Sequence, residues 1–181
     1  MIRFFDFFLS LIGVIILSPI FIIVFFMGLF DTGAPIFLQK RMGKDKREFT
    51  LIKFRTMPLN TKSVASHLVN NTPTPLGGFL RKTKLDELPQ LINVLRGEMS
   101  LVGPRPNLFN QYELIELRDK KGVYNYLPGI TGLAQIHNID MSTPDLLSST
   151  DRDMLISLTL SRYFSYIFQT IKGSGQGDAI K

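Results

Sequence analysis

The segment from Phe7 to Phe30, FFLSLIGVIILSPIFIIVFFMGLF, contains no charged residue and decides the class of fold. As one helix it would be about 36 Å long at ~1.5 Å per residue, long enough to enter the hydrocarbon core of a bilayer. A secretory signal peptide is disfavoured, because the run is too long for a signal core and no small-x-small cleavage pattern follows it. The segment therefore predicts a membrane anchor.

Ser18-Pro19 interrupts this segment near its middle. Proline removes one backbone hydrogen bond and crowds the preceding turn, and the Ser18 hydroxyl can replace the lost partner, so we expect a bend. Lysines and arginines follow the segment, and Arg3 precedes it, so the positive-inside rule gives no reason to export either end. The residues alone leave a re-entrant anchor and a kinked spanning helix equally open.

The composition limits the partners and the chemistry. The chain has 181 residues, enough for one domain, and its 21 Lys and Arg against 15 Asp and Glu give a net charge of +6. This excess favours anionic partners such as nucleic acid, acidic lipid headgroups or phosphorylated small molecules. The chain contains no cysteine, which excludes disulfides, a thiolate nucleophile and cysteine-type zinc sites.

The rest of the pattern predicts an α+β domain. Residues 36–41 and 48–57 indicate a strand hairpin, residues 58–75 a loop, and residues 76–82 the start of a helix. A second helix is expected with Thr83 as its N-cap and Gly97 at its end. We divide the chain into an anchor (1–31), a catalytic domain (32–172) and a flexible Gly-rich tail (173–181).

A second apolar segment, residues 154–171, mixes leucine, isoleucine and aromatic residues with serine, threonine and Arg162. It is compatible with a core helix or with a helix in the lipid headgroup layer. We favour the second, with Tyr163 and Tyr166 at the water boundary.

Two adjacent acids, Asp86 and Glu87, lie in the stretch RKTKLDELPQ, residues 81–90. Acids at a helix start commonly complement the helix dipole. Adjacent residues point about 100° apart on a helix, however, so only one of the two serves the cap well. The neighbouring cations, and Arg105 between two prolines, favour ionised carboxylates and attract phosphate. This combination suits phosphoryl transfer, in which one acid attacks phosphorus and the other helps to hold Mg²⁺.

Three longer motifs carry a family resemblance. KFRTM (53–57), LRKTKLDELPQLINVLRGEMSLVGPRP (80–106) and PGITGLAQI (128–136) follow the Ser18-Pro19 segment in this order. The chain, from about Phe4 to Ile136, resembles the bacterial sugar transferases known as monotopic phosphoglycosyl transferases. It departs from many relatives after GLAQ, where it has His137-Asn138-Ile139 in place of Asn-Gly-Arg, so the resemblance leaves the sugar open.

The resemblance implies transfer of a sugar 1-phosphate from a UDP-sugar to polyprenyl phosphate, with release of UMP, to start the assembly of a surface glycan. It implies Mg²⁺, a re-entrant anchor broken at Ser18-Pro19, interfacial helices, and a place on the cytoplasmic face of the bacterial inner membrane. It is compatible with a homodimer. Asp86 would be the nucleophile, forming a covalent phosphosugar intermediate, and Glu87 would bind the metal. The expected substrate-binding residues are Lys53, Arg55, Arg81, Gly103, Arg105, Thr131 and Gln135.

A different class of protein fits part of the same pattern: a membrane-anchored basic module that binds acidic lipid or nucleic acid without catalysis. That reading gives Asp86 and Glu87 no role. The aromatic residues also gather in the apolar segments instead of alternating with the basic ones, as a nucleic-acid groove would require. We therefore expect no nucleic-acid partner.

Overall fold

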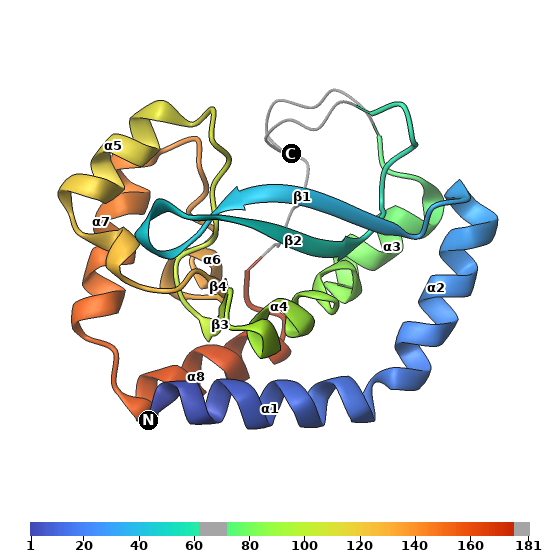
Figure 1. Ribbon diagram of the computed structural model, residues 1–181, viewed down its shortest axis with the longest axis horizontal. Coiled ribbons are helices and arrows are strands. Elements are labelled where there is room, and N and C mark those ends of the chain that lie inside the picture. Colours follow the sequence, from blue (N-terminus) through green and yellow to red (C-terminus); the bar gives the residue numbers. More distant parts are fainter. Residues whose placement is uncertain (62–71, 176–181) are drawn as a thin grey trace.

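A long two-stranded hairpin crosses the middle of the molecule, and helices lie below it and at both of its ends (Figure 1). The computed structural model describes residues 1–61 and 72–175. Most of the predicted loop 58–75 and the end of the predicted tail lie outside the described residues. The helices are α1 Ile2–Ile16, α2 Ser18–Thr32, α3 Pro75–Thr83, α4 Gln90–Arg96, α5 Tyr112–Lys120, α6 Leu133–Ile136, α7 Pro144–Ile156 and α8 Leu160–Ile171, and the strands are β1 Ile36–Met42, β2 Glu48–Phe54, β3 Ser100–Val102 and β4 Gly129–Thr131.

The N-terminal apolar segment forms two helices, α1 and α2, which are bent by 62° at Leu17. Ser18 Oγ donates to the carbonyl of Ile15 at 2.8 Å, and Pro19 lies in the first turn of α2, where its missing N–H costs nothing. The predicted bend at Ser18-Pro19 is thus confirmed. Among the described residues no single helix has the length and apolar character to cross a bilayer, whereas this bent pair does when its two helices are taken together.

The predicted hairpin is confirmed, although its second strand ends at Phe54 and not at residue 57. Strands β1 and β2 pair antiparallel from Ile36 opposite Phe54 to Met42 opposite Glu48. Helix α4 packs against β2, and Phe49, Leu51, Val94 and Met99 form one buried cluster between them. The buried Asn93 side chain bonds to the backbone of β2, accepting from Ile52 N at 3.1 Å and donating to Thr50 O at 2.8 Å.

The predicted N-cap at Thr83 is wrong. Thr83 is the last residue of α3, where its hydroxyl donates to Phe79 O at 2.9 Å, and Lys84 follows in the left-handed conformation. The acids then lie in a short 3₁₀ turn, Leu85–Glu87, and α4 begins only at Gln90. Pro89 explains the difference, because its ring blocks a continuous helix from Thr83 onward.

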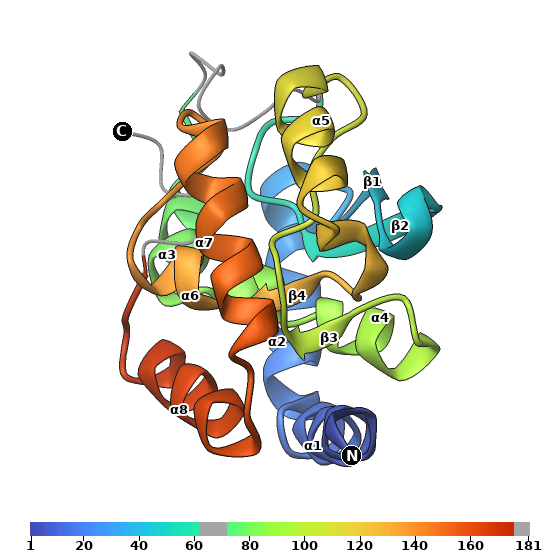
Figure 2. The ribbon, with the colours of Figure 1, turned by 90° about the vertical axis from the view of Figure 1, so that its left-hand side faces the viewer.

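Helix α8 lies beside α1 along one side of the molecule (Figures 1 and 2), with the rings of Phe5 and Phe164 5.2 Å apart. Its outer face carries exposed Phe168 and Ile171. The prediction that Tyr163 and Tyr166 lie at a water boundary is wrong, since they are only 0% and 8% exposed. They occupy the inner face of an amphipathic helix and pack into the core.

Helix α1 is joined to the rest of the protein by a buried acid, Asp6, which is 1% exposed. Its Oδ1 accepts from Ser100 Oγ at 2.9 Å, from Leu101 N at 2.9 Å and from the Tyr163 hydroxyl at 2.8 Å. Burial, with Asp6 alongside, raises the pKa of Tyr163, which therefore remains a donor at neutral pH. One carboxylate thus links α1, β3 and α8.

Candidate active site

The two predicted catalytic acids are both buried, Asp86 at 4% and Glu87 at 7% exposure. They occupy the 3₁₀ turn Leu85–Glu87, which is held between α3 and α4 by Lys84 in the left-handed conformation and by Pro89. A buried carboxylate stays ionised only when cations or hydrogen-bond donors compensate it. The neighbours of the turn therefore decide its chemistry.

Glu87 is compensated by two of the predicted cations. Its Oε1 lies 2.8 Å from Arg105 Nη2 and 3.3 Å from Lys53 Nζ. The Lys53 side chain is 7% exposed and that of Arg105 is 21% exposed. Lys53 comes from β2, Arg105 from the loop after β3, and Glu87 from the 3₁₀ turn. The fold thus brings together three predicted site residues that are distant in the sequence.

Lys84 adds a third positive charge close to this group. Burial lowers the pKa of Lys84, and Arg105 lowers it further, whereas Glu87 raises it. Its Nζ donates to the carbonyl of Ser174 in the first part of the tail. The acids therefore lie among several cations, which is an arrangement that attracts phosphate.

The loop that carries Arg105 is held by a different hydrogen bond at each of four successive carbonyls. Pro104 O accepts from Gly129 N at 2.9 Å, and Asn107 O accepts from Met42 N at 3.0 Å. Arg105 O accepts from Arg118 Nη1 at 2.9 Å, and Pro106 O from Arg41 Nη1 at 3.2 Å. Two prolines add their fixed φ angles. The backbone of Arg105 is therefore fixed in position.

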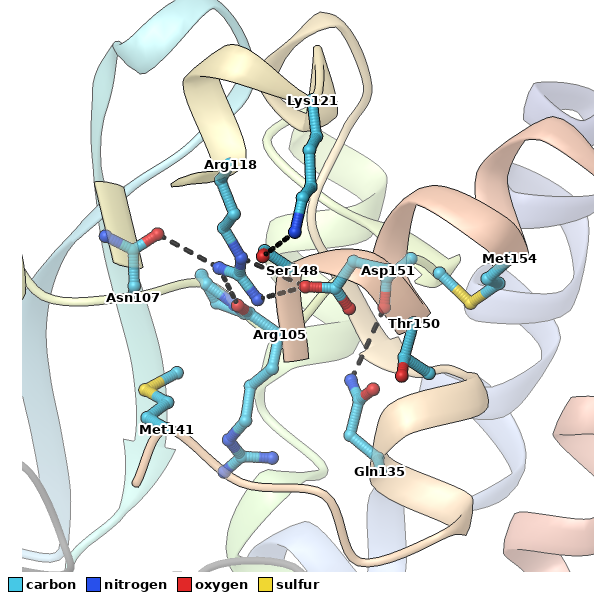
Figure 3. Close-up of polar contacts among 12 residues, drawn as sticks. Arg105, Asn107, Arg118, Lys121, Gln135, Met141, Ser148, Thr150, Asp151 and Met154 are labelled. Atoms are coloured by element: carbon cyan, nitrogen blue, oxygen red, sulfur yellow. Dashed lines mark hydrogen bonds and ion pairs between the residues drawn. The ribbon is translucent and has the colours of Figure 1, made fainter. Parts of the chain in front are cut away.

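Arg118 is buried behind this loop, at 1% exposure, and lies between Asn107 and Asp151 (Figure 3). Its Nε and Nη2 donate to Asp151 Oδ2 at 3.0 and 2.6 Å, and its Nη1 also donates to Asn107 Oδ1 at 3.0 Å. Burial raises the pKa of Asp151, and the Arg118 charge opposes that rise. The pair joins α5, α7 and the Arg105 loop in the interior.

Two further predicted cations contact other parts of the fold. Arg81 Nε donates to Thr56 Oγ1 at 2.9 Å, which links the last turn of α3 to the segment that follows β2. Arg55 Nε donates to Ala34 O at 2.8 Å, and its guanidinium lies 5.4 Å from the centre of the Phe37 ring. Within the part of the chain that the structure describes, Arg55 thus contacts the chain at the start of β1 and neither of the acids.

Of the three remaining predicted residues, Gly103 and Thr131 lie where β3 and β4 meet, and Gln135 lies in α6. Gly103 contacts the β4 backbone so closely that a Cβ on it would lie 2.8 Å from Gly129 N. The hydroxyl of Thr131 pairs with that of Thr170 in α8 at 2.5 Å. Gln135 Nε2 donates to Gly103 O at 3.4 Å, while its Oε1 has no partner among the residues that the structure describes. Gly103 and Thr131 therefore have visible structural roles here.

Sequence reasoning missed Arg41, Gln90, Arg118 and Asp151 as parts of this region. A clue existed for the last two, because Arg118 follows Leu114, and Asp151 follows Leu147, by one helical turn on a buried stripe. A charge in the middle of an apolar stripe is typical of a buried ion pair. The sequence contains no comparable clue for Arg41 or Gln90.

Comparisons with known proteins agree with the motifs. The family model for bacterial sugar transferases matches residues 1–176. An undecaprenyl-phosphate galactose phosphotransferase of Salmonella typhimurium is 35% identical, with 94% of this chain and 39% of the relative covered. A UDP-glucose:undecaprenyl-phosphate glucose-1-phosphate transferase of Escherichia coli is 38% identical, with 90% of this chain and 36% of the relative covered.

A shorter relative, the exopolysaccharide production protein ExoY of Sinorhizobium fredii, is 38% identical, with 74% of this chain and 67% of the relative covered. The chain thus spans about a third of the length of the first relatives it matches, between 32% and 39%. The family match nevertheless covers nearly all of the chain. The chain belongs to the bacterial sugar transferase family.

Proposed function

We propose that this protein transfers a sugar 1-phosphate from a UDP-sugar to a polyprenyl phosphate such as undecaprenyl phosphate. The observation that carries the proposal is the buried pair Asp86 and Glu87. Lys53 and Arg105 both form ion pairs with Glu87 Oε1. Family membership supports the same reaction, since relatives carry names for the transfer of galactose phosphate and glucose 1-phosphate to undecaprenyl phosphate. Such a transfer would begin the assembly of a surface glycan.

The proposed chemistry has two displacements at one phosphorus atom. An Asp86 carboxylate oxygen attacks the phosphorus that bears the sugar, the bond from that phosphorus to the bridging oxygen breaks, and UMP leaves with the bond's electron pair. A polyprenyl phosphate oxygen then attacks the same phosphorus and frees the Asp86 carboxylate. Lys53 and Arg105 stabilise the negative charge on the phosphate oxygens during both steps.

The acids also fit Mg²⁺, which proteins usually hold through one or two carboxylates while substrate phosphates and waters complete its octahedron. The part of the chain that the structure describes has no group of three or more His, Cys, Asp or Glu that would hold an ion by itself. Glu87, with Asp86 beside it, would therefore hold the ion together with the substrate. When bound, Mg²⁺ neutralises charge on the diphosphate and makes it a better electrophile.

The bent helix pair supports a re-entrant anchor on the cytoplasmic face of the inner membrane. Exposed apolar side chains cover much of both helices, among them Phe8, Ile12, Phe26 and Phe30, and α8 adds Phe168 beside α1. Each helix has only 15 residues, or about 22 Å at ~1.5 Å per residue, too short to cross a hydrocarbon core of ~30 Å. A bend at Leu17 therefore lets the chain enter one leaflet and return.

The covalent step is tested by mass spectrometry of the full chain in detergent, mixed with Mg²⁺ and each of a panel of UDP-sugars. We expect a mass increase equal to one sugar phosphate with the correct donor, on the peptide that contains Asp86, and loss of the adduct when polyprenyl phosphate is added. Turnover without any adduct, or an adduct confined to another residue, would contradict the proposed intermediate.

The anchor is tested with single cysteines, since the natural chain has none. One variant carries a cysteine added before Met1, and the other is Asn125→Cys in an exposed turn of the domain. A re-entrant anchor predicts that a membrane-impermeant maleimide labels both in inverted inner-membrane vesicles and neither in intact spheroplasts. If the two cysteines are labelled from opposite sides, the segment spans the membrane.

A further inference from the structure

Gln90 is a buried polar side chain beside the candidate acids. It is the first residue of α4, three positions after Glu87, and it is 3% exposed. A side-chain amide offers both hydrogen-bond donors and an acceptor. At this place it is therefore suited to bind a ligand.

The side chain of Gln90 borders a pocket beside the acids. Arg41, Lys53 and Arg105 line the same pocket, and Leu51 and Pro106 add apolar walls. Lys53 and Arg105 are the two cations that contact Glu87 Oε1. The pocket is thus continuous with the candidate active site, and its described walls combine three cations with one neutral amide.

The walls of the pocket are held by contacts with one another and with residues outside the pocket. Arg41 donates from Nε and Nη2 to Gln39 Oε1 at 3.0 and 2.6 Å, and from Nη1 to Pro106 O. Pro106 adjoins Arg105, whose own carbonyl is held by Arg118. A pocket with fixed walls and a positive potential needs little rearrangement to bind an anion.

We propose that Gln90 contacts substrate and that this pocket binds a phosphate group, with the amide N–H of Gln90 donating to a phosphate oxygen while Lys53 and Arg105 balance the charge. The inference rests on the proposed function, because it names a contact for the phosphate-bearing substrates of that reaction. The nucleotide diphosphate and the polyprenyl phosphate present the same chemistry to the pocket. Binding measurements with each of them identify which one occupies it.

The test is Gln90→Glu in the detergent-solubilised full chain, with dissociation constants measured for UDP and, separately, for a short polyprenyl phosphate. The new carboxylate repels phosphate, so we expect binding to weaken by about tenfold or more for the ligand that occupies the pocket. The same carboxylate lies among three cations, so the unfolding temperature should stay constant or rise. A structural role for Gln90 predicts the reverse, with lower stability and unchanged dissociation constants.

Two more variants complete the design. Gln90→Met keeps the length of the side chain and removes its hydrogen-bonding groups, so binding of the same ligand should weaken by a smaller factor. This variant replaces Gln90→Glu in the test if Gln90→Glu does not fold. Gln169→Glu makes the same chemical change on α8, where the amide donates to Ser165 Oγ, and should leave both dissociation constants unchanged.

The outcomes separate this inference from the proposed function. If the wild-type protein binds UDP or the polyprenyl phosphate and both Gln90 variants bind them equally well, Gln90 is not a substrate contact and the reaction is unaffected. If the wild-type protein binds neither ligand, the proposed function fails and this inference with it.

Discussion

Replacing Asp86 with asparagine is expected to reduce sugar-phosphate transfer by a factor of about 10³ or more, because the amide lacks the carboxylate oxygen that attacks phosphorus. Asparagine has nearly the same shape, so the fold should persist. The measurement is UMP release from the preferred UDP-sugar in the presence of polyprenyl phosphate. The sugar-phosphate adduct should disappear together with turnover.

The matched control is Asp153→Asn, which makes the same chemical change at an exposed residue of α7 and should leave turnover unchanged. The pair also separates the enzyme from a basic membrane module that binds acidic lipid without chemistry. Such a module would treat both variants alike. Turnover within tenfold of wild type in Asp86→Asn would remove Asp86 from the role of nucleophile.

Replacing Asp151 with alanine is expected to lower the free energy of unfolding by about 3–5 kcal/mol, because it leaves the Arg118 guanidinium buried without its counter-charge. Arg118 is 1% exposed and donates two hydrogen bonds to Asp151 Oδ2, so water cannot easily replace the carboxylate. The measurement is chemical denaturation of the detergent-solubilised protein. Asp153→Ala, on the exposed side of the same helix, should change the free energy by less than about 0.5 kcal/mol.

A double variant sharpens this second prediction. Arg118→Met with Asp151→Leu removes both charges and fills the space with apolar atoms, so it should be more stable than Asp151→Ala alone. Transfer activity should still fall, since the Arg105 carbonyl loses the donor that holds it. If Asp151→Ala unfolds at the same denaturant concentration as wild type, the pair contributes little and the Arg105 loop is held by its other contacts.

Local chemistry made part of this fold predictable. The bend at Ser18-Pro19, the hairpin and the end of α4 at Gly97 each follow from one residue type or from a short alternation, so the sequence was sufficient for them. Thr83 shows the limit of such reasoning. Its spacing to Asp86 matches a capping box, yet Pro89 prevents the helix that the box would begin, and Thr83 closes the preceding helix instead.

The site shows the same division. Asp86, Glu87, Lys53 and Arg105 were predicted from charge and motif, and the fold brings Lys53 and Arg105 onto Glu87. Arg41 and Gln90 could not be found in this way, because their positions beside the acids arise from how β1 and α4 pack against the Arg105 loop. Long-range packing of this kind leaves no periodic pattern in a sequence. The division of the chain at residue 31 stays a prediction.

The three hydrogen bonds to Asp6 have a practical consequence for anyone who wishes to work without lipid or detergent. Deleting α1 would expose part of the hydrophobic core. It would also remove the hydrogen-bond acceptor of Ser100, Leu101 N and Tyr163. A water-soluble form is better obtained by replacing the exposed phenylalanines of α1 with polar residues and keeping the buried residues of that helix, including Asp6. Helix α1 is therefore part of the folded core of the protein as well as of the proposed membrane anchor.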